Sequence, residues 1–177
     1  MNRLHPQKPF RLIRIAFCAG LLVMPVSAPS QTGTATATVK EFYRFHFAVR
    51  KRMHFSRQNI GKVKKWLTAE LYGLMSGEFK REEAYRQQHP DEKPYFSGDV
   101  FTDSESPPQT FRIGKASQQK TRATVSLTVL WDDDTVGKME RQIEVQLLKQ
   151  QGRWRIANLV YEPGRDLLSE LKRPNYQ

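Results

Sequence analysis

Between Thr110 and Tyr161 apolar and polar residues alternate, and this pattern constrains the fold more than any other feature. The three clearest runs have these apolar residues at every second position or close to it: Ala123, Val125, Leu127, Val129 and Trp131; Met139, Ile143, Val145 and Leu147; Trp154, Ile156 and Val160. A period of two is typical of a strand with one buried and one wet face. With Phe111 and Ile113 in an earlier strand, the stretch predicts an antiparallel meander.

Turn-forming residues separate these runs. Asp132–Asp134 with Gly137 predicts the first long turn, and Gln150–Gly152 predicts the second. The Asp triplet lacks the alternating spacing of a calcium loop, so a solvated hairpin tip is the better interpretation. On the polar face, Glu140 and Glu144 are expected to pair across strands with Arg153 and Arg155, although a protein-docking face is an alternative.

Before and after the predicted strands, the sequence contains segments whose apolar residues have helical spacing. Thr38, with Glu41 as the capping box, predicts the start of a helix that runs from Val39 to about Arg57. A second helical region is expected from Lys62 to Gln88, split by Thr68 as an internal N-cap. A short helix is expected over 166–172, with Leu167, Leu168 and Leu171 facing inward. The fold class is therefore α+β, with N-terminal helices packed on a curved antiparallel β-sheet.

The first residues differ in kind from the rest. Residues 1–28 combine a basic head, the apolar run Ile15–Val26 and small residues before a cleavage site, which predicts a secretory signal peptide. The apolar run is shorter than the roughly 20 residues of a transmembrane helix, so no span is expected after cleavage. An uncleaved anchor is the alternative. Residues 29–38 are expected to form a short leader, and 39–177 a single periplasmic domain.

Charge and cysteine content limit the chemistry. The only cysteine, Cys18, lies in the predicted signal, so the mature chain would have no disulfide and no thiolate site. Of the net charge of +11, the basic head supplies +4. The remaining excess favours an anionic small molecule, an acidic glycan or an acidic protein as partner, rather than nucleic acid. A solvated basic surface without a partner is the alternative.

One group of polar side chains is a candidate site. Tyr43, His46 and Arg50 share one face of the first predicted helix, because they lie one turn apart. Asp99 and Asp103 lie in the Pro- and Gly-rich loop 89–108, and loops often carry function. These residues could bind an anionic ligand through the Arg50 guanidinium. Alternatively, Arg50 pairs with Asp99 to fasten the loop, while His46 is a hydrogen-bonded core residue.

No catalytic motif, metal-ligand spacing or phosphate-binding loop is found in the chain. The sequence therefore predicts no catalytic residue, no metal and no cofactor. A binding or interaction protein is expected rather than an enzyme. Two alternatives stay open: a small-pocket lyase or isomerase with His46 or Asp99 as general base, and an inhibitor or immunity protein for an envelope enzyme. A homodimer through the sheet face is also considered.

Four short motifs carry a resemblance: Phe42-Tyr43, Leu67-Thr68-x-x-Leu71, Gly98-Asp99-Val100-Phe101 and Gly152-Arg153-Trp154-Arg155-Ile156. In this order, over about Val39 to Tyr161, the chain resembles an uncharacterised exported bacterial family of unknown function. More widely it resembles the cone-like fold of nuclear transport factor 2 and the cystatins. The resemblance implies a pocket between sheet and helices. It implies no activity, because that fold group includes isomerases, dehydratases and binding modules.

Overall fold

The computed structural model describes residues 33–49, 59–92, 98–133 and 137–173, which all belong to one compact unit, Gln31–Gln177. Its helices are α1 (Ala35–Val49), the 3-10 helix η1 (Ile60–Trp66), α2 (Ala69–Gln88) and α3 (Leu167–Lys172). Its strands are β1 (Thr110–Gln118), β2 (Arg122–Asp133), β3 (Gly137–Gln150), β4 (Arg153–Glu162) and β5 (Arg165–Asp166). The predicted α+β class is confirmed.

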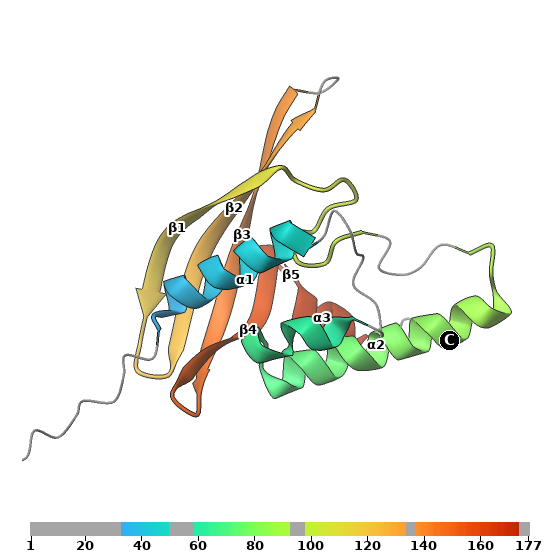
Figure 1. Cartoon of the computed structure of the whole chain (residues 1–177), viewed down its shortest axis with the longest axis horizontal. Helices are drawn as coiled ribbons and strands as arrows, with labels where there is room; N and C mark the ends of the chain where they lie inside the picture. The colour runs from blue at the N-terminus through green and yellow to red at the C-terminus, as the bar shows by residue number, and fades with distance from the viewer. Residues whose placement is uncertain (1–32, 50–58, 93–97, 134–136, 174–177) are drawn as a thin grey trace, which may run out of the picture. The chain divides into compact units, whose positions relative to one another are not determined.

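The five strands form one antiparallel meander in the order β1-β2-β3-β4-β5. Helix α1 packs on one face of this twisted sheet and contacts β1, β2 and β4 (Figure 1). The 3-10 helix η1 packs against β4, and α2 and α3 contact each other. One sheet face is therefore covered, which explains why the strands alternate between apolar and polar residues.

The core lies between α1 and the covered sheet face. Its inward-facing strand residues include Val125, Leu127, Val129, Ile143, Val145, Leu147 and Ile156, all at most 1% exposed. Helix α1 contributes Val39, Phe42 and Tyr43, and η1 contributes Val63 and Trp66. The apolar runs of the second and third strands thus face the core as the sequence predicts, over most of their length.

One predicted inward position is wrong, and another lies on the predicted face but is not covered. On β4 the pairing register shifts between Gln146 and Leu147 of β3, so that Leu159 and Tyr161 are buried and Val160 is only half-buried. Such a bulge adds one residue to a strand and reverses which residues face inward. On β3, Met139 is 41% exposed because it lies near the strand end, beyond the cover of α1.

The start of the first helix is also corrected. Helix α1 begins at Ala35, before the predicted cap Thr38. Thr34 is the capping residue, because its hydroxyl accepts a hydrogen bond from the Ala37 N–H at 3.1 Å. Residues 35–38 therefore belong to the helix rather than to a leader. The predicted signal peptide and the predicted helical residues 50–57 lie outside the described residues.

Other local predictions are confirmed. Thr68 lies between η1 and α2 and caps α2, with its side chain accepting from the Leu71 N–H at 3.2 Å. The tight turn between β3 and β4 has positive φ at Gln151 (50°) and Gly152 (77°), which matches the right-handed twist of the strands. Helix α3 is capped by Asp166, and of its three predicted inward leucines Leu168 is only half-buried.

The expected charge pairing on the open sheet face differs from the prediction. Glu140 pairs with Arg112 of β1 at 2.9 Å. Glu144 lies opposite Val160, and Arg155 lies opposite Leu148. β4 pairs with β3 only from Glu144 to Gln150, and Arg153 lies opposite Gln150, so Arg153 and Arg155 lie far along the strand from Glu140.

A candidate ligand-binding cleft

A cleft of about 930 Å³ opens beside the loop Gly98–Ser106. The rest of its lining comes from the adjoining ends of β2 and β3, from the end of β4, and from β5 and α3. These lining residues are Trp131, Met139, Glu140, Arg141, Tyr161, Arg165 and Glu170. Two aromatic rings and an exposed methionine thus share the wall with seven charged side chains, so this wall is more polar than that of most small-molecule sites.

The loop that walls the cleft is held in a tight turn. The Asp99 N–H donates to the Ser104 carbonyl at 2.8 Å, and the Thr102 N–H donates to the Asp99 carbonyl at 3.1 Å. Gly98 is required for this close approach, because a Cβ there would lie 2.5 Å from the Ser104 carbonyl oxygen. The loop is therefore a fixed part of the wall.

Three buried side chains fasten this loop to the core. The Tyr43 hydroxyl donates to the Phe101 carbonyl at 2.7 Å, and the Tyr161 hydroxyl donates to the Val100 carbonyl at 2.6 Å. His46 Nε2 lies 2.6 Å from Asp99 Oδ2. Burial raises the pKa of both tyrosines, so both keep the proton that they donate.

Asp99 lies on the boundary between core and cleft. Its side chain is 19% exposed, whereas that of His46 is 1% exposed. Burial by itself would raise the pKa of Asp99, but the hydrogen bond and the charge of His46, together with the Phe101 N–H, lower that pKa. An ionised carboxylate only accepts, so the His46 Nε2–H is the donor. Oδ1 accepts from the Phe101 N–H at 3.0 Å.

Asp103 joins the loop to the far wall. Its carboxylate accepts from Arg141 of β3 and from Arg165 of β5, with Oδ1 lying 2.9 Å from Arg165 Nη1. Its φ of 48° is a left-handed conformation that costs free energy in a residue other than glycine. The Arg165 guanidinium also lies 4.8 Å from the centre of the Tyr161 ring. The two ion pairs offset the cost of that conformation.

The cleft is acidic although the chain as a whole is basic. Its lining contains five carboxylates (Asp99, Asp103, Glu105, Glu140 and Glu170) but only two guanidiniums. Both guanidiniums bind Asp103, and Arg165 also pairs with Glu162 and Glu170. Each guanidinium of the described lining therefore already pairs with a carboxylate.

The structure brings together four of the five predicted site residues. Asp99 and Asp103 line the cleft, while Tyr43 and His46 lie behind the loop and support it. Arg50 lies outside the described residues. The predicted alternative in which His46 is a hydrogen-bonded core residue agrees with this geometry, with Asp99 as its partner.

The sequence reasoning missed the far wall of the cleft. Trp131, Tyr161, Arg141 and Arg165 had no predicted role there. One signal was present: Arg141 occupies an inward position of β3, between Met139 and Ile143. A charged residue at an inward position near a strand end indicates that the apolar face stops there and a polar site begins.

The described residues include no cluster of three or more His, Cys, Asp or Glu side chains that could hold a metal ion. None of the described helices is long and apolar enough to cross a bilayer. Comparison of the chain with protein-family models, with curated proteins and with solved structures finds no match.

Proposed function

We propose that this chain is an exported, non-catalytic binding protein of the cell envelope, and that its ligand binds in the cleft beside Gly98–Ser106. The observation that carries the proposal is a cleft of about 930 Å³ whose wall is fixed from behind by three buried hydrogen-bonding side chains. A site that is formed before the ligand arrives binds at a lower entropic cost.

The charges and rings of the cleft suggest the ligand's chemistry. Carboxylates outnumber guanidiniums, and Trp131 and Tyr161 offer ring surfaces. A neutral or cationic ligand with an apolar part fits this lining better than an anion does, because aromatic rings and carboxylates both attract cations. The anionic ligand expected through Arg50 stays a prediction, since Arg50 lies outside the described residues.

Catalysis is the weaker candidate. A general base must reach the substrate with a free lone pair and a suitable pKa. Asp99 already accepts from His46 and Phe101, and its lowered pKa makes it a weak base. His46 is only 1% exposed. The lyase or isomerase and the inhibitor or immunity protein stay alternatives without a specific observation in their favour.

The finer fold and the compartment belong to the same proposal. A meander whose covered face holds the N-terminal helix is compatible with the cystatin-like or nuclear-transport-factor-2-like cone. Export to the periplasm is supported by the basic head and apolar run in residues 1–28. A homodimer through the open sheet face is compatible with that face being uncovered in the unit.

A cleft-blocking substitution tests the proposed site. A panel of neutral and cationic small molecules would first be screened by thermal melting, and hits re-measured on Met139→Arg and Gln142→Arg. Both residues are exposed on β3, but only Met139 lines the cleft. We expect Met139→Arg to weaken binding at least about tenfold and Gln142→Arg to leave it unchanged. Equal affinities for both variants would place the site elsewhere.

A further inference from the structure

Five cations gather where two hairpins of the sheet end. This hairpin-tip cluster consists of Lys120 and Arg122 at the β1–β2 turn and Lys149, Arg153 and Arg155 at the β3–β4 turn. A backbone hydrogen bond joins the two tips, from the Lys149 N–H to the Thr121 carbonyl at 2.9 Å. Arg122 and Arg155 both lie opposite Leu148, one on each side, on the open face of the sheet.

The strand segments next to the cluster contain no acidic residue that could balance its charge. The sequence contains no Asp or Glu from Lys115 to Trp131, nor from Val145 to Tyr161. None of the ion pairs among the described residues includes a member of the cluster. Like charges held together without counter-charges destabilise a fold, so such a local conflict indicates a surface kept for a partner.

We propose that the hairpin-tip cluster docks the protein on an anionic phospholipid bilayer. Each lysine or arginine close to an anionic lipid surface strengthens binding by a similar increment, and several together give stable but reversible attachment. Four of the five cations are exposed, and Arg155 is half-buried. The cluster therefore presents enough accessible positive charge for a flat anionic surface.

The first residues of α1 lie close to the hairpin-tip cluster. The Ala35 N–H donates to Gln118 Oε1 at 3.5 Å, so α1 begins beside the β1–β2 turn. Figure 1 shows the first turn of α1 at the same end of the sheet as both hairpin tips.

A nucleic-acid strand fits the cluster less well. Single strands bind to basic grooves in which exposed aromatic rings stack on the bases. The one aromatic residue of these tips, Trp154, is only 4% exposed. The Lys149 Nζ lies over its ring, 5.7 Å from the ring centre. The docking surface lies away from the acidic cleft, so this inference does not depend on the cleft ligand.

Vesicle binding tests the proposal. The compact unit Gln31–Gln177 contains every buried residue of the described chain, so it is tested without the N-terminal segment. The probe is vesicles of equimolar phosphatidylglycerol and phosphatidylcholine at about 0.1 M salt, with pure phosphatidylcholine vesicles as reference. The triple variant Lys120→Gln, Lys149→Gln, Arg153→Gln is expected to bind about a hundredfold more weakly, or about fivefold per cation.

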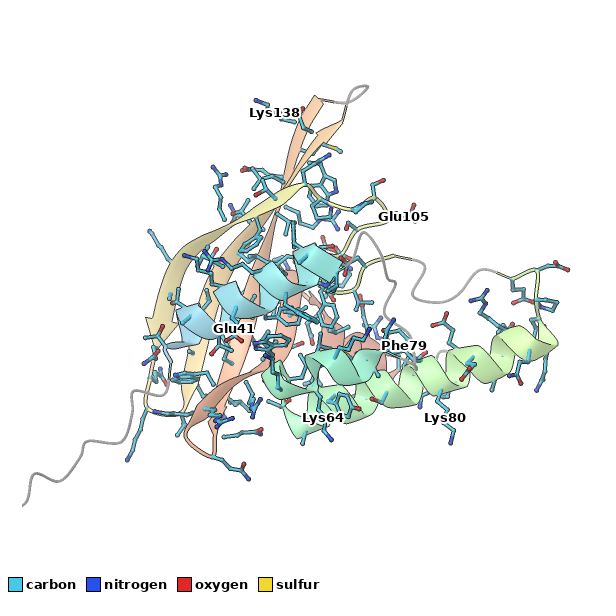
Figure 2. All side chains as sticks on the ribbon, in the orientation of Figure 1. Glu41, Lys64, Phe79, Lys80, Glu105 and Lys138 are labelled. Atoms are coloured by element: carbon cyan, nitrogen blue, oxygen red, sulfur yellow. The ribbon has the colours of Figure 1, made fainter. Side chains whose placement is uncertain are left out.

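A matched triple variant separates location from net charge. Lys80→Gln, Arg86→Gln, Lys138→Gln removes the same charge from exposed positions on α2 and at the far end of β3, where Figure 2 labels Lys80 and Lys138. We expect it to lower vesicle binding less than about threefold, because these residues lie outside the hairpin-tip cluster. If the cluster triple does not fold, the three single variants must each show the fivefold loss.

Three results would overturn the proposal. In the first, the unit binds anionic and neutral vesicles equally. In the second, the two triple variants show the same loss of vesicle affinity. In the third, single-stranded DNA or an acidic polysaccharide binds the tips while anionic vesicles do not, which would replace the bilayer by a soluble polyanion. Melting temperatures measured on every variant show that each comparison is made between folded proteins.

Discussion

Asp99 connects the core to the cleft more directly than any other described residue. Its carboxylate accepts from His46 and from the Phe101 N–H, while the same side chain lines the cleft. The buried His46 is in turn in contact with the rings of Phe42 and Phe101. A change at either member of the pair is therefore expected to alter both stability and the cleft wall.

The His46–Asp99 pair gives the first prediction. In His46→Leu the Asp99 carboxylate loses a donor in a mostly buried position, which should lower the free energy of unfolding by about 2 kcal/mol. In the double variant His46→Leu, Asp99→Asn the decrease in the free energy of unfolding should be smaller than the sum of the two single decreases. The difference, which is the coupling energy of the pair, should be about 1 kcal/mol. Urea unfolding of the four proteins measures both quantities. Additive losses would show that the two side chains do not interact.

The lowered pKa of Asp99 predicts loss of stability in acid. A carboxyl group whose pKa is lower in the folded state stabilises the fold above its unfolded-state pKa of about 4. That stability is lost as the pH falls through the folded-state pKa. The free energy of unfolding of the wild type should therefore decrease below about pH 4 more steeply than that of Asp99→Asn.

Asp166 is the internal comparison for this pH dependence. Its pKa is lowered too, because hydrogen bonds from Ser169 and Asn158 outweigh the effect of burial. The Asp99→Asn variant should therefore keep the acid sensitivity that Asp166 contributes. Identical pH profiles for the wild type and Asp99→Asn would contradict the role assigned to Asp99.

At the scale of elements, Thr68 caps the start of α2, directly after the end of η1. Its hydroxyl accepts from the Leu71 N–H, and its own N–H donates to the Ile156 carbonyl at 2.8 Å. Thr68→Ala should lower the free energy of unfolding by about 1 kcal/mol, whereas Thr68→Ser keeps the acceptor and should lose only a few tenths. Thermal or urea unfolding measures this, and equal losses would contradict the capping role.

The sequence predicted those elements whose signals are local. The alternation in Ala123–Val129 and the cap at Thr68 depend on neighbouring residues, and both are confirmed. The bulge that turns Leu159 inward was not predicted, because it depends on how β4 pairs with β3. The start of α1 was placed too late because two threonines, Thr34 and Thr38, are both suitable caps.

Only part of the candidate site was predictable, because only part of it has a signal in neighbouring residues. Helical spacing put Tyr43 and His46 on one face, and loop position singled out Asp99 and Asp103. The far wall with Trp131, Arg141, Tyr161 and Arg165 comes from four strands that meet only in the folded sheet. No local pattern could show that these residues face Asp103, so the cleft itself was not predicted.

At the scale of the whole unit, positive and negative charges lie in different places. The hairpin tips are basic, whereas carboxylates outnumber guanidiniums around the cleft (Figure 2 labels Glu105 on its loop). A net charge alone would not reveal this separation. Docking at the tips would leave the cleft free to bind a neutral or cationic ligand, so the two proposed surfaces are compatible with each other.

The central claim is that the cleft beside Gly98–Ser106 binds a ligand, and the indole N–H signals of the three tryptophans test it most directly. Trp131 lines the cleft and donates to the Ser106 carbonyl at 2.8 Å, whereas Trp66 and Trp154 are buried elsewhere. In an NMR titration with the compounds that raise the melting temperature, the Trp131 signal should shift while the other two stay in place. If the shifts occur at Trp66 or Trp154, or if no compound moves the Trp131 signal, the cleft is not the binding site.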